Sequence, residues 1–387
     1  MRSEYLVYVG NWYIPEIMNP GGISTFRFSV KEGTLSLLGQ CAENVNVGAM
    51  ALDAEHHVLY ATDERSGQYN TPGGSLLSFT LDGQTGLPRK KSMVSSLGIY
   101  PSKIALDQSG KYLLLTNLSG PASVCRTYRK ADGSYGIGVK YDESNLVLFR
   151  RTPEGELGEA ADLVVFRELG THPLQSHAMA HSVTLAPGKE LFLVCDKGSD
   201  YIRFYRIDEE RQKLACCGEA YTPVPGSGSR YAVFHPAQPY FYHNNELLAK
   251  LCVYRYSEDG GMQHLQTVSM LPEGMEVPSH LGLRERPAPA DLVLSPDGRY
   301  LYASLRKLDQ ILVFKVEQET GRLTFIQVVS SGGENPRGLA VDPSGQYLLA
   351  ANLDTKAIAV FAIQKDGTLW DTGNRAPAPN PGSIVFA

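Results

Sequence analysis

A hairpin-like pattern that recurs along the whole chain constrains the fold more than any other feature. Each copy is a short apolar strand, a turn usually rich in Pro, Gly or Asp, and a second strand rich in Tyr, Leu and Val. This order is the local signature of a β-hairpin. Five clear copies and a weaker sixth occupy residues 102–117, 181–196, 230–245, 290–304, 337–352 and, for the weaker one, 49–63. Repetition of one such unit predicts a propeller or a solenoid.

The spacing between the copies favours a propeller. The last residue before the turn is, in successive copies, Asp53, Asp107, Ala186, His235, Ser295 and Asp342. The separations between successive members of this series are 54, 79, 49, 60 and 47 residues. A four-stranded propeller blade takes about 40 to 50 residues. Each interval therefore holds one blade, and the longest interval holds a blade with an insertion.

A seventh copy is divided between the two ends of the sequence. Residues 380–387 resemble 335–342, and residues 6–11 resemble 348–352. We therefore expect the last strand to pair with the first, so that both ends build one blade. The prediction is an all-β, seven-bladed β-propeller that spans 1–387 as a single domain, with a closed ring that leaves only short, protected sheet edges.

Two segments depart from the repeat. Residues 129–176 contain an insertion with a polar stretch at 152–159, and residues 272–289 are rich in proline. Insertions in repeat proteins fall on loops and often shape the binding face. They are equally compatible with tolerated surface decoration.

Charge and composition exclude several classes of function. The net charge is -5, the sequence pI is about 6.0, and no run of Lys or Arg is long enough to follow a phosphate backbone, so we expect no nucleic-acid partner. The first ten residues already have a strand pattern and no apolar run approaches about 20 residues, so we expect a cytoplasmic protein without a membrane partner. Six cysteines in so long a chain do not suggest a disulfide framework. The oligomeric state is not predicted.

The repeat allows the blades to be aligned with one another. In an antiparallel hairpin, the start of the first strand and the end of the second lie at the same end of the blade. The residues five before and eleven after each turn marker should therefore share one rim of the ring. These fourteen positions are Gly48, Ser102, His181, Arg230, Ala290, Arg337 and Gly382, followed by Glu64, Leu118, Lys197, Glu246, Arg306, Leu353 and Trp12.

Half of these rim positions carry ionisable side chains, whereas the charged fraction of the whole chain is 20%. The column one residue earlier in the second strand is nearly uniform Asn or Asp. Short amides and carboxylates bond to local backbone where strands end, so we interpret that column as structural. Function more often lies in the column that differs from blade to blade. A solvated rim with ion pairs is the alternative interpretation.

His177 and His181 are four residues apart, a separation at which two histidines on a helix can ligate zinc. Here the segment runs into the strand pattern 182–185, and neither a Cys-x-x-Cys nor a His-Glu-x-x-His motif accompanies it. We therefore predict no metal site and no cofactor.

Several stretches resemble a known family. They are residues 294–302, residues 335–337 with 348–352, and residues 8–10 followed by 22–23. In these stretches, and over essentially the whole chain, the sequence is similar to the seven-bladed propeller lactonases. That family contains one type of 6-phosphogluconolactonase and the fungal carboxy-cis,cis-muconate cyclase. The resemblance implies a propeller fold, lactone chemistry and an active site on the rim.

Four of the rim residues match the family's proposed active site. The histidine before a strand, the arginine of a Gly-Pro-Arg-His motif, the glutamate of an Asn-Glu strand end and the arginine of a Ser-Asn-Arg-Gly motif correspond to His181, Arg230, Glu246 and Arg306.

The neighbours of these four residues depart from the family motifs. Ser229 and Tyr231 stand beside Arg230 where the family has Pro and His. Leu305 and Lys307 flank Arg306 where the family has Asn and Gly, and two extra residues separate the two histidines. These differences bear on the choice of substrate rather than on the family.

The leading hypothesis is hydrolysis of a small-molecule lactone of the 6-phosphogluconolactone type. Neutral His181 is the candidate general base, and Glu246 is its orienting residue or a partner acid/base. Arg230 and Arg306 are candidates for stabilising the oxyanion and for binding a carboxylate or phosphate. Further substrate contacts are expected from Arg337, Glu64, Lys197 and His177.

Two other functions remain open from the sequence. A cycloisomerase of the muconate-cyclase type would use the same groups to transfer a proton at carbon while the arginines bind carboxylates. A propeller without catalytic activity would bind a ligand or a protein partner, because propellers support many unrelated functions.

Overall fold

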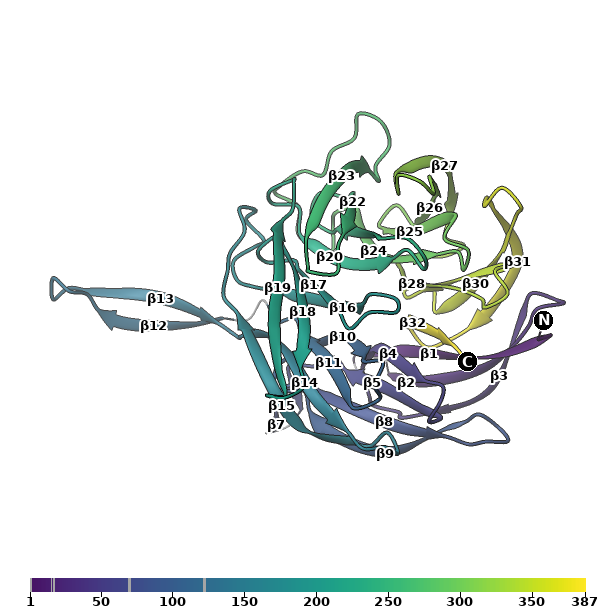
Figure 1. The fold of residues 1–387 in the computed structure, drawn as a ribbon, viewed down its shortest axis with the longest axis horizontal. Helices are drawn as coiled ribbons and strands as arrows, with labels where there is room; N and C mark the ends of the chain where they lie inside the picture. The colour runs from purple at the N-terminus through teal and green to yellow at the C-terminus, as the bar shows by residue number, and fades with distance from the viewer. Residues whose placement is uncertain (1, 15, 17, 69–70, 121–122) are drawn as a thin grey trace.

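The chain folds as a ring of β-sheets (Figure 1). The computed structural model describes residues 2–14, 16, 18–68, 71–120 and 123–387, and in these ranges every element of regular structure is a strand. None of these residues belongs to a helix long and apolar enough to cross a membrane.

Seven four-stranded antiparallel sheets form the blades. From the inner to the outer strand, three blades consist of β4 (Val47–Asp53), β5 (Val58–Asp63), β8 (Ser75–Leu81) and β9 (Pro88–Ser95); of β10 (Pro101–Leu106), β11 (Tyr112–Asn117), β14 (Ser144–Arg151) and β15 (Leu157–Phe166); and of β16 (Ala180–Leu185), β17 (Phe192–Asp196), β18 (Tyr201–Asp208) and β19 (Lys213–Tyr221).

Three more blades follow the same plan, and the chain ends complete the ring. These blades consist of β20 (Ser229–Phe234), β21 (Tyr240–Asn245), β22 (Lys250–Tyr256) and β23 (Met262–Ser269); of β24 (Ala288–Leu294), β25 (Tyr300–Arg306), β26 (Gln310–Val316) and β27 (Leu323–Ser330); of β28 (Pro336–Val341), β29 (Tyr347–Asn352), β30 (Ala357–Ile363) and β31 (Leu369–Pro377); and, for the last, of β32 (Pro381–Phe386), β1 (Glu4–Ile14), β2 (Asn19–Ser29) and β3 (Thr34–Cys41).

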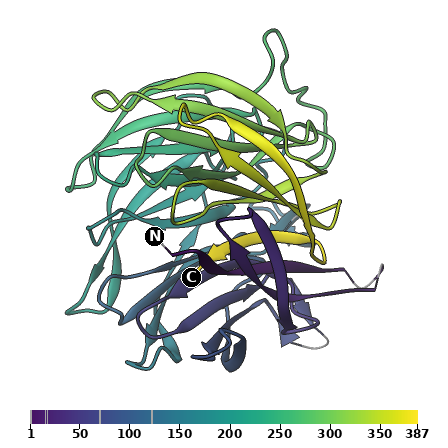
Figure 2. The same cartoon turned by 90° about the vertical axis from the view of Figure 1, so that its right-hand side faces the viewer.

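The closure of the ring by the two chain ends is confirmed. Strand β32 pairs antiparallel with β1, with Val7 opposite Phe386 and Asn11 opposite Pro381. Figure 2 shows the N- and C-terminal strands lying together in this blade. The innermost strands contact one another around the ring in the order β4, β10, β16, β20, β24, β28 and β32. The predicted hairpins therefore include the strands that surround the central channel.

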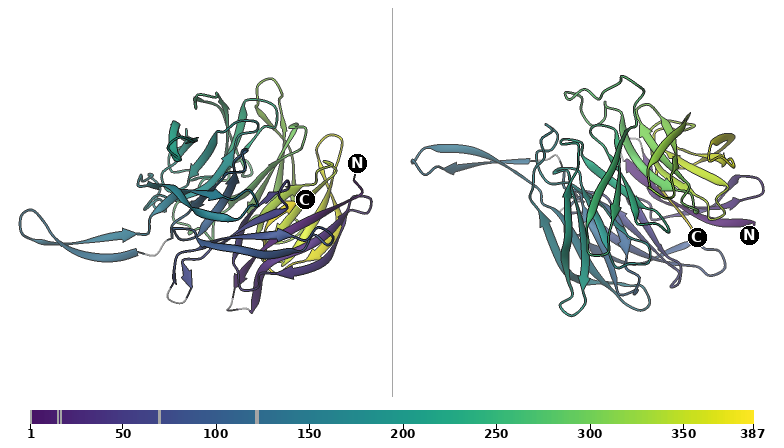
Figure 3. Two further views of the ribbon diagram at one scale, coloured as in Figure 1. Left: turned by 60° about the horizontal axis from the view of Figure 1, so that its bottom comes forward. Right: turned by 45° about the horizontal axis from the view of Figure 1, so that its top comes forward.

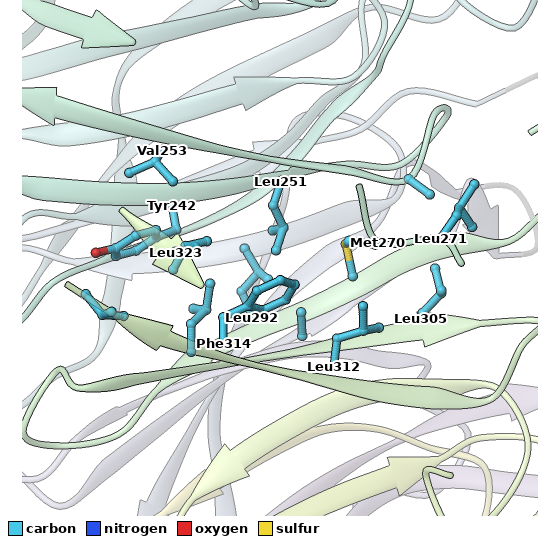
Figure 4. Close-up of a cluster of buried hydrophobic side chains, with 14 of the residues drawn as sticks. Tyr242, Leu251, Val253, Met270, Leu271, Leu292, Leu305, Leu312, Phe314 and Leu323 are labelled. Carbon is cyan, nitrogen blue, oxygen red and sulfur yellow. The ribbon is translucent and has the colours of Figure 1, made fainter. Parts of the chain in front are cut away.

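Apolar side chains between neighbouring blades form the core. In the cluster between β20–β23 and β24–β27, Tyr242 and Leu251 pack with Leu292 and Phe314 (Figure 4). All four side chains are buried. Burial of such surface contributes about 25 cal/mol per Å². Because equivalent clusters lie between the other blades, the strand ends that carry the rim are held by packing on both sides.

The longest departure from the repeat is a two-stranded arm between β11 and β14. It consists of β12 (Ser123–Arg129) and β13 (Tyr135–Tyr141), and it projects away from the ring (Figures 1 and 3). The arm begins before the predicted boundary at residue 129. Within the polar stretch at 152–159, expected in the insertion, residues 152–156 form the turn from β14 into β15 and residues 157–159 begin β15. A smaller hairpin of β6 (Gly67–Gln68) and β7 (Thr71–Pro72) lies between β5 and β8.

The Asn/Asp column bonds to backbone, as expected for a structural role. The Asn117 amide donates to the Ser96 carbonyl at 2.7 Å, and the Asp196 carboxylate accepts from the Met179 N–H at 2.8 Å. Equivalent bonds between side chain and backbone are made by Asn11, Asp63 and Asn352. These bonds fix the second strand one residue before the rim in five of the seven hairpins. Of the other two, one has Asn245, which bonds to the side chains of Ser227 and Cys252, and the other has Leu305 at this position.

Candidate active site

A β-bulge interrupts the inner hairpin of every blade at the same rim. In β16 the ladder shifts register between Ala180 and Ser182, which leaves His181 outside it. The same shift leaves out the corresponding residues of the other blades, namely Gly48, Ser102, Arg230, Ala290, Arg337 and Gly382. A bulge bends its strand and redirects a side chain, and bulges are common beside active sites. The first predicted rim column is therefore the bulge column.

Glu246, which follows β21, is the centre of a buried charge cluster. Its Oε1 accepts a hydrogen bond from Arg306 Nη2 at 2.6 Å, and its Oε2 lies 3.3 Å from both Lys197 Nζ and Arg230 Nε. The Arg230 side chain is 2% exposed and the Arg306 side chain is 14% exposed. The cluster is thus not a solvated band of ion pairs, and one carboxylate faces three cations.

The surrounding charges determine the protonation state of Glu246. Burial alone raises the pKa of this carboxyl, but Lys197, Arg306 and Arg230 together hold the pKa of Glu246 well below its usual value. Burial lowers the pKa of the Lys197 ammonium, and the Glu246 charge opposes that shift. Glu246 is therefore ionised at neutral pH, and its contacts suit it to hold the cations rather than to donate a proton.

His181 lies beside this cluster and is also buried. Its imidazole packs edge-to-face against the Tyr231 ring, with the ring centroids 5.2 Å apart. Its Nδ1 is buried and has no hydrogen-bond partner among the described residues. Burial, reinforced by the charges of Arg230 and Lys197, lowers the pKa of His181 well below its usual value. The imidazole is therefore neutral at pH 7.

His177 occupies a different environment, at the base of the arm. Its ring stacks on Tyr141 with the centroids 4.3 Å apart, and Ser176 Oγ lies 3.0 Å from its Nδ1. Burial and the nearby Lys197 charge lower the pKa of His177. Within the ranges that the structure describes, no three His, Cys, Asp or Glu side chains are grouped so as to hold a metal ion.

Trp12, which lies beneath Arg337, and Glu64 cover the two glycines of the bulge column. The Arg337 guanidinium lies 4.0 Å from the centre of the Trp12 ring, and Trp12 covers Gly382, where a Cβ would come within 2.9 Å of the indole nitrogen. The Glu64 carboxylate covers Gly48 in the same way. Burial, together with the charges of Arg306 and Arg230, lowers the pKa of Arg337 to about 10, so the guanidinium stays charged at pH 7.

The eight predicted site residues lie at one rim. Burial raises the pKa of Glu64, and the charges of Arg337, Arg230 and Lys197 oppose that rise, which places these four groups within electrostatic reach of one another. The charge of Arg306 also lowers the pKa of Arg337. The charge of Lys197 lowers the pKa of His181 and of His177, and the charge of Glu246 raises that of Lys197.

Tyr231 and Lys103 complete the rim, and neither was among the predicted site residues. The Tyr231 ring is contacted by the Arg230 guanidinium at 4.2 Å and by Lys103 Nζ at 4.6 Å. A cavity of about 540 Å³ runs along the central channel, and at the rim its lining includes Gly48, Lys103, Tyr231, Arg337 and Gly382.

Comparison with protein families decides the identity of the fold. A family model described as "Lactonase, 7-bladed beta-propeller" matches residues 7–386. The chain belongs to this lactonase family. The resemblance inferred from the sequence is confirmed.

Relatives of this lactonase cover nearly its whole length. A 6-phosphogluconolactonase from Formosa agariphila is 28% identical over 348 residues, 88% of each chain. A 6-phosphogluconolactonase from Bacillus subtilis is 22% identical over 99% of each chain. Among solved structures, the periplasmic gluconolactonase of Pseudomonas aeruginosa has a TM-score of 0.82 and 24% identity, and covers 100% of this chain and 99% of its own. That last similarity bears on the fold alone.

One departure of this lactonase from the family motifs has a clear backbone consequence. Lys307 replaces the glycine that follows the motif arginine, and it has a φ of 74°. This left-handed region favours glycine and is uncommon for other residues. Lys307 therefore adopts a backbone conformation that glycine reaches more easily, and it places a side chain directly after Arg306.

Proposed function

We propose that this lactonase hydrolyses a sugar-acid lactone of the 6-phosphogluconolactone type at the rim. The observation that carries the proposal is His181, a neutral imidazole whose buried Nδ1 has no hydrogen-bond partner among the described residues. It lies beside three cations that share one carboxylate. Lactone opening requires a base that activates water and positive charge that stabilises the carbonyl oxygen. Relatives named 6-phosphogluconolactonase support this substrate class.

The first step forms a bond between water and the lactone carbonyl carbon. His181 accepts a proton from the water as its oxygen attacks, and the carbonyl oxygen becomes an oxyanion. Arg306 is suited to donate to that oxygen because it is more exposed than Arg230, which is almost fully covered. Donors already fixed in place stabilise the oxyanion without reorganising at the moment of reaction.

The second step breaks the ring C–O bond. The protonated imidazole of His181 returns its proton to the departing alkoxide, which becomes the hydroxyl of the open hydroxy acid. Water is added across one ester bond, so atoms and charge balance without an oxidant or reductant. Glu246 keeps Arg230, Arg306 and Lys197 in position throughout and remains ionised.

The test is turnover of 6-phosphogluconolactone and unphosphorylated gluconolactone, corrected for spontaneous opening, by wild type and by His181→Ala. We expect the substitution to lower the enzymatic rate at least tenfold, since general base catalysis contributes roughly 10²–10⁴. His264→Ala is the matched control, because His264 lies exposed on β23 and should leave the rate unchanged.

Each other outcome has a definite meaning. A decrease of less than about tenfold in a folded His181→Ala protein would remove His181 from the mechanism. No turnover of either lactone would reject the proposed substrates, and analysis of products from a muconate-type substrate would then test for cycloisomerisation.

A further inference from the structure

Two cations at the rim lack an acidic partner. In the described part of the chain, neither the Arg337 side chain nor the Lys103 side chain forms a hydrogen bond or an ion pair under the usual distance limits. Each lies instead over an aromatic ring, Arg337 at 4.0 Å from Trp12 and Lys103 at 4.6 Å from Tyr231. Both are half-buried.

Most other buried cations of the propeller are paired with acids, whereas Arg286 donates to backbone carbonyls. Arg151 contacts Asp53 at 2.7 Å and Asp107 at 3.1 Å. The three cations around Glu246 share its carboxylate. Removing a charge from water without a partner is unfavourable, so cations of this kind are normally neutralised inside a protein. Arg337 and Lys103 are therefore free to bind an anion that is not part of the chain.

Both cations line the same cavity. Arg337 belongs to β28 and Lys103 to β10, and the inner strands β32 and β4 lie between them on one side of the ring. The bulge residues of those two strands are Gly382 and Gly48, which contribute no side chains to the cavity mouth.

Two acidic side chains lie near this pair of cations. Asp291 lines the same cavity, and its carboxylate accepts backbone N–H bonds from Leu292 and Leu339. Glu64 is the second. It lies within electrostatic reach of Arg337 but forms no ion pair with it among the described residues. Burial raises the pKa of Glu64, which favours its neutral form and weakens its competition with a bound anion. A neutral carboxyl is also a hydrogen-bond donor to such an anion.

We propose that Arg337 and Lys103 form a second anion subsite, which holds a phosphate or carboxylate group of the substrate remote from the lactone carbonyl. This inference rests on the proposed function and names a substrate class, lactones that carry a second anionic group. Stacking on Trp12 orients the planar guanidinium and leaves its N–H edge free for a forked contact with two anion oxygens. The Glu246 cluster, which is a separate set of groups, then serves the carbonyl.

The test is equilibrium binding of open-chain acids, which no lactonase can hydrolyse. Calorimetric titration would compare gluconate, 6-phosphogluconate and glucarate, which differ only in whether the far end carries no charge, a phosphate or a carboxylate. We expect wild type to bind at least one doubly anionic acid tenfold or more tightly than gluconate. Whichever acid shows the gain identifies phosphate or carboxylate as the second group.

The variants Lys103→Met and Arg337→Gln should each reduce that preference to less than threefold, because they weaken binding of the doubly anionic acid more than binding of gluconate. Lys315→Met is the control, because Lys315 is an exposed residue of β26 paired with Glu317. Arg337→Lys keeps the charge and loses the forked geometry, so it should recover part of the preference and guards against a folding defect in Arg337→Gln.

Two results would overturn the subsite. One is a wild-type protein that does not distinguish the three acids, and the other is an equal loss of affinity for all three in the variants. These measurements involve no turnover. Failure of the hydrolase proposal would therefore appear in the kinetic experiment above, separately from failure of the subsite.

Discussion

At the scale of single residues, the rim carries two kinds of cationic side chain, those that share the Glu246 carboxylate and those that lie over aromatic rings. Glu246 contacts three cations in a closed cluster, whereas Arg337 and Lys103 lie over aromatic rings and form no ion pair with the residues that the structure describes. The first arrangement stabilises a fixed geometry, and the second leaves charge available to a ligand. His181 stands beside the first group, and its protonation state depends on those cations.

The pH dependence of turnover should report His181. Burial and the charges of Arg230 and Lys197 lower its pKa, so the imidazole stays neutral, and competent as a base, below its ordinary titration near pH ~6.5. We expect kcat/KM for the lactone to be level from pH 8 to 6.5 and to fall only at lower pH. An acid limb centred at or above pH ~6.5, measured in protein that remains folded, would contradict this assignment.

Replacing Glu246 should destabilise the fold far more than replacing Glu64. Glu246→Gln leaves three buried cations without their carboxylate, and breaking a buried ion pair from one side costs about 3–5 kcal/mol. Glu64→Gln removes a carboxyl that forms no ion pair among the described residues, and should cost less than about 1 kcal/mol. Urea unfolding at pH 7 measures both, and equal losses would show that the Glu246 cluster contributes little to stability.

The residues that could be predicted are those that follow the repeat. His181, Arg230 and Arg337 recur at one register position, so counting from the turn located them at the rim. Tyr231 and Lys103 lie one residue further along their strands, and the bulge brings them to the same rim. Counting residues from the turn assumes a regular ladder, so Tyr231 and Lys103 were not predicted as site residues. Each directly follows a residue of the first rim column, and this adjacency is the sequence signal that could have identified them.

At the scale of elements, the hairpin determines where function can lie. One end of the hairpin is a short turn. At the other end, the first strand begins with a bulge, and the second strand usually ends with an Asn or Asp residue that bonds to backbone. The strands and their pairing were predictable because apolar alternation and turn residues are local. The arm of β12 and β13 was not, because nothing in the repeat sets the pairing of inserted residues. The stacking of Tyr141 on His177 at its base was hidden for the same reason.

Removing the arm should leave the propeller stable. Its residues pair mainly with each other, and every side chain of β12 is exposed. Replacing residues 124–140 with a short Gly-Ser turn should therefore change Tm by less than about 3 °C, since surface changes are usually within ±0.5 kcal/mol.

The control for this experiment is Leu146→Ala in the neighbouring strand β14. Leu146 is fully buried, so the substitution should cost about 2–5 kcal/mol and lower Tm clearly. A large loss from the arm replacement would mean that the arm takes part in the folding unit.

At the scale of the whole molecule, the ring depends on the contact between its first and last strands. Strand β32 supplies the inner edge of its blade and contacts both β28 and β4. Without it, β1 would present unpaired backbone groups to solvent, and open sheet edges promote association between chains.

Deleting residues 381–387 should therefore open the ring. We expect loss of a single cooperative unfolding transition and a shift to large species in size-exclusion chromatography. Phe386→Ala is a milder variant, because it removes aromatic contacts with Tyr5 and Phe28 but keeps the backbone pairing. A truncated chain that elutes at the same position as wild type and unfolds cooperatively would show that six complete blades and an open edge are sufficient.

The distribution of charge over the ring has a kinetic consequence. The chain as a whole is acidic, with a net charge of -5, yet one rim gathers five cations, which outnumber the acidic side chains of Glu64, Glu246 and Asp291 there. A local field of opposite sign to the rest of the surface concentrates anions at its mouth and raises their rate of encounter. An anionic substrate approaching from solution would thus be repelled by most of the molecule and drawn to one face. The speed of its capture would decrease as salt shortens the reach of that field.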